Sequence, residues 1–431
     1  MLEEKKSKIK QSVLRTKNRR TKMLCKVIEC KIDNSRINST TRKSLYKLFT
    51  EAKWLYNFMI DFMSIHKISE FNSKIKTVPV KVLDKTEERI FEQISAQMKQ
   101  GMQTRIFNSL SALSALKVKG HKVGKLKFKK FIKSIPLKQH TQTFTLFKRS
   151  KTIKIQGIKQ ALKVYGLNQI PEVCEIANAN LTKIGKDFYL QITIYVEKEI
   201  INVPDISIGI DFGCETQLTL SNGEKIKFQV PVDTRVKKFD RDLARKIKGS
   251  KNKQKEFLKR EKAYHTLVNQ KKEVKNKIVN SLVKKYKVIC FQDESIAEWK
   301  QNGHGKKIQN SALGGIIMAL QRKAVTPIVI DKYFPSSQLC SKCGNRHKLE
   351  LKDRVYVCEG CGNSIDRDVN AAKNIENEGV RLSKESNLSK TNALVPVECR
   401  EVKLVERTAA TAALRDGKQF ALKQETATAL A

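Results

Sequence analysis

The stretch CSKCGNRHKLELKDRVYVCEGCGNSIDRDVNAAKNI, residues 340–375, carries two cysteine pairs that lead within a few residues into closely spaced aspartates. Cys340 and Cys343 form the first pair, Cys358 and Cys361 form the second, and fourteen residues separate the pairs. This spacing predicts a zinc ribbon in which four thiolates bind one structural Zn²⁺. Because four thiolates leave no open coordination position, we expect the ion to support folding and not to take part in chemistry.

The whole chain is strongly basic. Its 431 residues include 86 Lys and Arg against 43 Asp and Glu, a net charge of +43. Such an excess predicts a polyanionic partner, with nucleic acid as the first candidate and an anionic membrane surface as the second. No apolar run approaches the roughly 18 residues of a membrane span, and the basic N-terminus lacks the apolar core of a signal peptide. We therefore expect a cytoplasmic protein with reduced cysteines, which argues against the alternative of a disulfide at the two pairs.

The first 66 residues show an arm, a strand and a helix in turn. Residues 1–22 are a basic arm, either a solvated tail or a segment that grips phosphates. Residues 23–33 predict a strand, and a helix follows from an N-cap at Ser39 or Thr40. One face of that helix carries apolar residues at helical spacing, namely Leu45, Leu48, Ala52, Leu55 and Met59.

The rest of the N-terminal half alternates between helix and strand patterns. A second helix is predicted at about 86–117, and residues 140–200 alternate like successive strands. Between them, in KVKGHKVGKLKFKKFIKSIPLKQH (117–140), lysine alternates with Val, Leu and Phe. That alternation predicts a half-buried strand whose outer face contacts phosphates. The N-terminal half is therefore expected to be a small β domain with a helical insertion.

The C-terminal half has the pattern of an α/β domain. A strand carries Asp211 near its end, and Asn222–Gly223 predicts a hairpin through which that strand turns back. A long basic helical stretch, broken near Gly249, leads to an apolar strand that begins at Lys287. A further helix at about residues 308–323, followed by a strand, predicts a parallel pair of strands.

Three carboxylates stand at the ends of these elements. Asp211 and Glu294 lie at strand ends, and Asp368 lies at the start of a helix directly after the cysteine pairs. In so basic a chain, converging carboxylates predict a bound divalent cation, Mg²⁺ or Mn²⁺. Two such ions, about 3.5–4 Å apart, can activate water and cleave a phosphodiester. For each acid alone, a helix cap or a surface charge is the alternative.

These motifs together resemble the TnpB family, the transposon-encoded, RNA-guided DNA nucleases related to type V CRISPR effectors. The resemblance rests on IGIDFG (208–213), KKIQNSAL (306–313), PSSQLCSKCG (335–344) and DRDVNAAKNI (366–375), with the acidic strand end between the first two. It covers residues 205–376 strongly and is weaker but collinear before them. The family's RuvC-like, RNase H-type nuclease uses an Asp, a Glu and an Asp. The first and third correspond here to Asp211 and Asp368, with Asp368 favoured over Asp366.

The resemblance implies a domain plan and a mechanism. A guide RNA made from the transposon end pairs with target double-stranded DNA, the protein reads a short flanking motif, and the metal site cleaves the DNA. The particle is then a ribonucleoprotein in the cytoplasm, associated with the nucleoid. The expected parts are a basic arm (1–22), a β-barrel wedge domain (23–36 and 122–202), a helical recognition domain (37–121), a RuvC-like nuclease domain (203–334 and 363–378), an inserted zinc ribbon (335–362), and a disordered or loosely helical tail (379–431).

The middle acid departs from the family pattern, which usually reads Glu-Asp-Leu after the apolar run. This chain has Gln292, Asp293 and Glu294, so that Gln292 takes the place of the glutamate. Because residues two apart share a strand face, Glu294 is the favoured ligand, with Asp293 or an impaired site as alternatives. An impaired site would make the chain an RNA-guided DNA-binding protein. A transposase acting on transposon ends and a zinc-ribbon RNA-binding protein are further alternatives.

Overall fold

The computed structural model describes most of the chain as two compact units. One unit holds the described residues up to 197 together with Arg245–Glu261, and the other holds the remaining described residues between 203 and 390. Each unit is described by itself below. Among the described residues, no helix is long and apolar enough to span a membrane. The described residues are 2–82, 85–197, 203–228, 234–294, 296–299, 308, 311–350 and 353–390.

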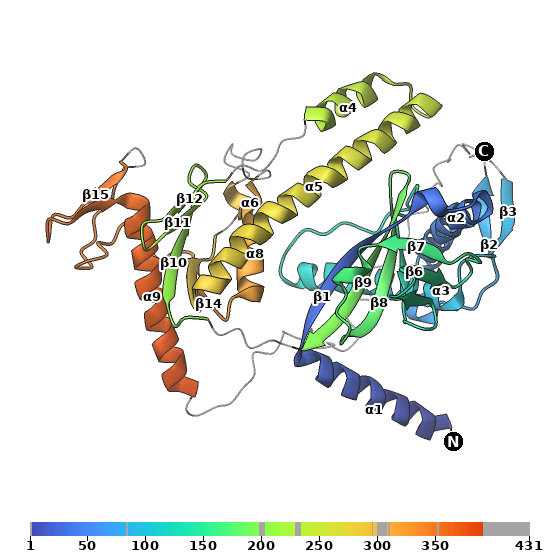
Figure 1. Cartoon of the computed structure of the whole chain (residues 1–431), viewed down its shortest axis with the longest axis horizontal. Helices are drawn as coiled ribbons and strands as arrows, with labels where there is room; N and C mark the ends of the chain where they lie inside the picture. The colour runs from blue at the N-terminus through green and yellow to red at the C-terminus, as the bar shows by residue number, and fades with distance from the viewer. Residues whose placement is uncertain are drawn as a thin grey trace. The chain divides into compact units, whose positions relative to one another are not determined.

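The first unit is built on a barrel-like sheet of seven strands in the order β4-β8-β9-β1-β7-β6-β5, with antiparallel pairing throughout (Figure 1). In β9 buried and half-buried residues alternate, because successive side chains of a strand point to opposite faces. The predicted strand at residues 23–33 is confirmed. The strands are β1 (Met23–Ile32), β4 (Ser134–Leu137), β5 (Phe144–Phe147), β6 (Thr152–Ile155), β7 (Leu162–Tyr165), β8 (Glu175–Ile184) and β9 (Asp187–Glu197).

Two long helices pack on this sheet, α2 (Ser39–Phe62) and α3 (Ala96–Val118). The five apolar residues predicted to share a face of α2 are all fully buried in the core that the helices form with the sheet. The N-cap prediction was wrong by one residue, because Asn38 caps α2 by accepting a hydrogen bond from the Thr41 N–H at 2.7 Å. Short 3₁₀ turns lie at Asn34–Arg36, Ile68–Glu70 and Leu167–Gln169.

The predicted start of the second helix was wrong. Residues Lys85–Ile90 form β3, which pairs with β2 (Thr77–Val82) in a hairpin. The helix starts at Ala96, where Ser95 is the N-cap and accepts a hydrogen bond from the Met98 N–H at 3.3 Å. Just before it, the buried Glu51 carboxylate accepts hydrogen bonds from three successive N–H groups, those of residues 92–94. A buried carboxylate with these partners fixes the loop before the helix.

The lysine-rich segment before β4 and the basic arm also differ from prediction. Of the strand predicted within residues 117–140, only Ser134–Leu137 is present, as β4, and residues 121–133 are not a strand. In that irregular part the backbone of Lys129 pairs with the Asn57 side chain of α2, at 3.0 and 2.8 Å. The arm contains a helix, α1 (Leu2–Thr21). Its last turn is attached to the sheet where Arg20 bonds Glu175 and lies 4.7 Å from the centre of the Tyr195 ring.

The second unit contains a five-stranded sheet in the order β12-β11-β10-β13-β14. Numbered within the sheet, this order is 3-2-1-4-5, with two antiparallel pairs on one side and two parallel pairs on the other. The parallel pair of strands is therefore confirmed. The Asn222–Gly223 hairpin lies between β11 and β12, and not directly after the strand of Asp211 as predicted. The strands are β10 (Ser207–Phe212), β11 (Leu218–Leu220), β12 (Lys225–Ile226), β13 (Val288–Gln292) and β14 (Thr326–Ile330).

Helices cover both faces of this sheet (Figure 1). Residues of α5 (Lys251–Lys285) and α8 (Leu313–Lys323) pack on one face, and α9 (Arg367–Lys390) packs on the other. At Gly209 of β10 the helix comes so close that an added Cβ would lie 2.0 Å from the Ala372 carbonyl oxygen of α9. The sheet thus holds the start of α9 firmly beside the end of β10.

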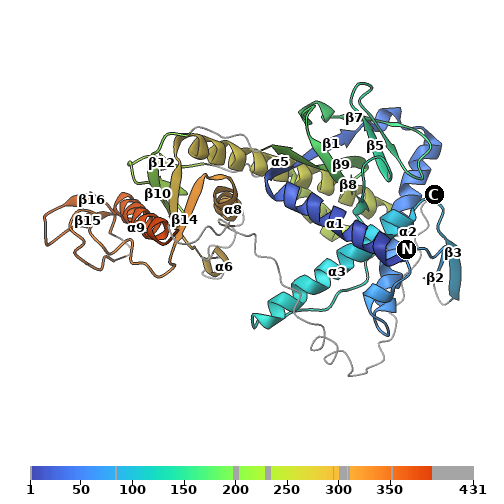
Figure 2. The same ribbon diagram turned by 90° about the horizontal axis from the view of Figure 1, so that it is seen from below.

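The remaining elements of the second unit connect and extend this core. The long basic stretch is two helices, α4 (Thr234–Arg245) and α5, which break at Gly249 as predicted. A short helix, α6 (Ile296–Trp299), follows β13. The cysteine-rich insertion contains β15 (Val355–Val357) and β16 (Ser364–Asp366), an antiparallel pair beside the start of α9 (Figure 2). The helix predicted at the exit of this insertion is present as α9.

Candidate metal centres

The three acids expected to bind a divalent cation all belong to the second unit. Asp211 lies near the end of β10, Glu294 lies two residues beyond the last residue of the parallel neighbour β13, and Asp368 is the second residue of α9. All three are half-buried. Parallel neighbours end at the same edge of a sheet, and α9 begins beside them. The topology therefore brings the three carboxylates toward one edge.

The charges of Glu294 and Asp368 affect the pKa of Asp211. Burial raises the pKa of Asp211 to about 8, and the charges of Asp368 and Glu294 add to the rise, while Arg367 opposes it. Burial also raises the pKa of Glu294 to about 7, with Asp293 adding and Lys332 opposing. Raised pKa values mean that the ionised forms are unfavourable here without a positive partner. Among the described residues, the oxygens of the three acids do not all lie within 4.8 Å of one another.

The residues next to Glu294 have other surroundings. Asp293 is exposed, and its N–H donates to the Ile330 carbonyl at 3.1 Å. Gln292 is buried, and its amide nitrogen lies 3.1, 2.9 and 2.9 Å from the carbonyl oxygens of Asp331, Lys332 and Phe334. Its amide oxygen accepts a hydrogen bond from the Ser336 hydroxyl at 3.0 Å. These contacts engage both ends of the Gln292 amide, and of residues 292–294 it is Glu294 whose charge raises the pKa of Asp211.

Asp366 and Asp368, the two aspartates at the exit of the ribbon, have distinct surroundings. One oxygen of Asp366 accepts the N–H groups of Asp368 and Val369 at 3.1 and 3.2 Å, so Asp366 is the N-cap of α9. Its other oxygen lies 2.7 Å from the Lys225 ammonium of β12. Asp366 therefore serves to hold the helix start, and the Asp368 carboxylate is left to interact with Asp211.

The four cysteines of the insertion lie together. Their sulfurs all lie within 4.8 Å of one another, with Cys340 3.7 Å from Cys361 and Cys343 3.5 Å from Cys358. Four ligands at about 2.3 Å from a tetrahedral zinc ion lie about 3.8 Å apart, so the cluster fits a structural Zn²⁺. No disulfide occurs among the cysteines in the described ranges.

The backbone around the cysteines is shaped for thiolates. Gly344 and Gly362 follow the second cysteine of each pair and have φ of 76° and 66°, a conformation that glycine adopts without strain. Burial raises the pKa of the Cys340 thiol, but backbone N–H groups of Cys343 and Lys342 and the thiols of Cys358 and Cys361 outweigh that effect and bring the pKa to about 6. The backbone N–H of Asn345 lowers the pKa of Cys343, but the neighbouring thiols raise it to about 12. A bound cation would therefore be needed to hold all four sulfurs as thiolates.

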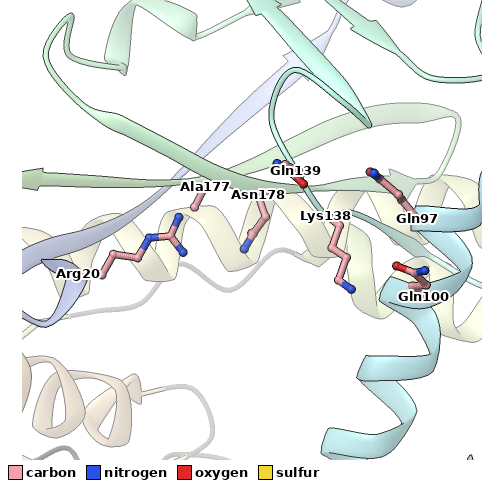
Figure 3. A pocket seen from close by; sticks show the side chains of 7 residues that line it. All are labelled: Arg20, Gln97, Gln100, Lys138, Gln139, Ala177 and Asn178. Carbon is pink, nitrogen blue, oxygen red and sulfur yellow. The ribbon is translucent and has the colours of Figure 1, made fainter. Parts of the chain in front are cut away.

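A polar pocket in the first unit is a separate candidate for nucleic-acid contact (Figure 3). It has a volume of about 370 Å³ and lies where α3 and the end of α1 meet the strands β4 and β8. Cations and side-chain amides line it, and no carboxylate does. No sequence motif marks this pocket, because its residues come from four separate elements. The lining residues are Arg20, Gln97, Gln100, Lys138, Gln139, Ala177 and Asn178.

Fold and sites together define a class: a strongly basic protein with a barrel-like sheet, an α/β sheet in 3-2-1-4-5 order edged by carboxylates, and a four-cysteine ribbon. Residues 316–375 match the family described as "Cas12f1-like, TNB domain". A Streptomyces pristinaespiralis protein named "Putative RNA-guided DNA endonuclease" is 34% identical over 186 residues, which are 41% of this chain and 46% of that protein. The "TnpB-like protein L79" of Acanthamoeba polyphaga mimivirus is 23% identical over 79% of this chain and 71% of its own length.

The chain is thus similar to TnpB-like proteins and to proteins named as RNA-guided DNA endonucleases. The aligned part spans about half the length of the Streptomyces relative. Among solved structures, the "Cas12f1-sgRNA-target DNA complex" covers 78% of this chain and 80% of its own, at 15% identity and a TM-score of 0.40.

Proposed function

We propose that this protein is an RNA-guided, metal-dependent DNA endonuclease. The observation that carries the proposal is the half-buried Asp211 carboxylate at one edge of the α/β sheet, on which the charges of Asp368 and Glu294 act. Carboxylate oxygens are the ligands that Mg²⁺ and Mn²⁺ prefer, and a cation would stabilise the ionised forms of Asp211 and Glu294, which burial disfavours first and neighbouring acids disfavour further. Names of relatives that include "RNA-guided DNA endonuclease" support the same activity.

The chain's own residues have definable roles in the proposed reaction. Asp211, Glu294 and Asp368 would hold the divalent ions, and the first two would release protons on metal binding at neutral pH. Divalent ions held there would supply activation of a water and stabilisation of the leaving oxygen of the DNA backbone. Arg367 lies near enough to Asp211 to lower its pKa, so it offsets negative charge at the site.

The partners in this proposal are a guide RNA made from the transposon end and target double-stranded DNA, in a cytoplasmic, nucleoid-associated ribonucleoprotein. The domain plan stays as proposed: wedge at 23–36 and 122–202, recognition at 37–121, nuclease at 203–334 and 363–378, and ribbon at 335–362. We assign reading of the short flanking DNA motif to the polar pocket. Its amides suit base edges, above all adenine, and Lys138 suits phosphates, whereas Arg20 is already paired with Glu175.

The test is to purify the chain with its bound RNA, sequence that RNA, and offer DNA that matches its variable end. We expect cleavage that requires Mg²⁺ or Mn²⁺ and stops in Asp211→Ala and Asp368→Ala, while RNA binding stays at the level of the unaltered chain. Binding of matched DNA without cleavage, with no effect of either substitution, would instead favour the alternative of a DNA-binding protein with an impaired site. The departure at Gln292, which motivated that alternative, has a separate explanation in its hydrogen bonds.

A further inference from the structure

We infer that Gln292 is a positioning residue that sets the place of Glu294 relative to Asp368. It belongs to a buried set of polar side chains, the amide clamp, which consists of Gln292, Ser336, Asn370 and Asn374. The clamp joins the end of β13, the loop after β14 and the start of α9. This inference rests on the proposed function, because it assigns a role beside the proposed metal ligands.

The first half of the clamp holds the loop after β14 against the end of β13. The Gln292 amide nitrogen, with two hydrogens, lies within 3.1 Å of three backbone carbonyl oxygens of residues 331–334. A glutamate at this position would turn a carboxylate toward three acceptors, with only the Ser336 hydroxyl to donate. The chemistry at this position therefore requires an amide. That requirement explains why the residue is Gln, where the resemblance leads one to expect Glu.

The second half of the clamp holds the same loop against α9. Asn374 donates to the carbonyl oxygens of Ser336 and Leu339 at 2.8 and 2.7 Å. Asn370 donates to the Leu339 carbonyl at 2.6 Å and accepts the Ser341 N–H at 2.9 Å. Both asparagines are buried, so a lost partner would leave a polar group unsatisfied. Ser341 lies within the first cysteine pair, and the clamp therefore also attaches the ribbon to α9.

The clamp brackets the proposed metal ligands. Glu294 lies two residues after Gln292, beyond the end of β13. Between them, the Asp293 N–H donates to the carbonyl oxygen of Ile330, the last residue of β14. Asp368 lies two residues before Asn370 on α9. With the loop after β14 fixed to both, the backbone at Glu294 and the backbone at Asp368 are held in one arrangement. Partners behind metal ligands typically affect metal affinity tenfold to a hundredfold.

The test uses Gln292→Met, which keeps the length of the side chain and removes its hydrogen bonds. The matched control is Gln103→Met in α3, because the Gln103 amide also donates to two backbone carbonyls, at 2.7 and 3.1 Å, in the first unit. Mn²⁺ binding to the zinc-loaded chain is followed by electron paramagnetic resonance, and bound zinc is measured by elemental analysis. We expect Gln292→Met to weaken Mn²⁺ binding by about tenfold or more with zinc retained, and Gln103→Met to leave Mn²⁺ binding unchanged.

Further measurements make each outcome decisive. If Gln292→Met does not fold, Ser336→Ala replaces it, since that change removes only the hydrogen bond to the Gln292 oxygen. Ser336→Ala should also weaken Mn²⁺ binding. The variant Gln292→Glu should not bind Mn²⁺ more tightly than Gln292→Met does. Unchanged Mn²⁺ affinity in Gln292→Met or in its replacement overturns the positioning role alone. If Mn²⁺ affinity is the same in the wild type and in Asp211→Asn, the proposed function is overturned as well.

Discussion

Proton competition at the proposed metal site gives a prediction that does not depend on knowing the guide RNA. The pKa values of Asp211 and Glu294 lie at about 8 and about 7, so both carboxyls are mostly protonated at pH 6. A divalent ion needs both in the ionised form and must displace two protons. Because the raised pKa values keep both carboxyls protonated near neutral pH, affinity for the ion should rise as pH rises.

The size of the effect follows from the same two pKa values. Treated as independent, the fraction of sites with both carboxyls ionised is about 1 in 1,000 at pH 6 and about 1 in 20 at pH 7. Mn²⁺ affinity should therefore rise on the order of fiftyfold between pH 6 and pH 7, and about tenfold more by pH 8. Two carboxyls with ordinary pKa values near 4 would give almost no change over this range.

The assay is Mn²⁺ titration of the zinc-loaded chain by electron paramagnetic resonance at pH 6, 7 and 8. In Glu294→Gln one of the two protons is absent, so the rise from pH 6 to pH 7 should fall to tenfold or less. Asp205→Asn is the control, because Asp205 is exposed and paired with Lys287 away from the three acids. An affinity that is flat from pH 6 to pH 8 in the wild type would refute the convergence of the carboxylates.

Three further predictions concern the sites one by one. Cys358→Ser should lower bound zinc from about one per chain and destabilise the ribbon, as measured by elemental analysis and limited proteolysis. Asp366→Ala should lower the stability of α9 by about 0.5–2 kcal/mol through loss of the N-cap, seen as faster amide hydrogen exchange in its first turns; unchanged exchange would contradict the cap. Binding of nucleic acid should weaken steeply with salt, by about 0.7–0.9 in the log–log slope for each phosphate neutralised, and a flat response would assign the basic surface another role.

Periodicity carried most of the fold prediction. The apolar face of α2 repeats at helical spacing over five residues, and all five are buried as expected. The strand of Asp211 and the parallel pair could likewise be predicted, because alternation and the strand–helix–strand order are local signals. The zinc ligands needed only the spacing of four cysteines.

The errors arose where a distant residue decided the local structure. The loop before α3 is held by the buried Glu51 carboxylate, and the backbone of Lys129 bonds the Asn57 side chain. Both partners lie on α2, far away in sequence. The start of α3 itself did have a local signal, because Ser95 is its N-cap. Gln292 is the corresponding case at the site: its departure from the family pattern was visible, but its partners in residues 331–336 were not.

The most direct test of the central claim is cleavage of DNA by the purified ribonucleoprotein, with the target chosen to match the co-purified RNA. We expect metal-dependent cutting in the wild type and in Asp293→Asn. We expect none in Asp211→Ala, Glu294→Gln or Asp368→Ala, although these three variants still bind the RNA. Cutting that persists in any of the three variants, or that is lost in Asp293→Asn and retained in Glu294→Gln, would contradict the assignment of the site.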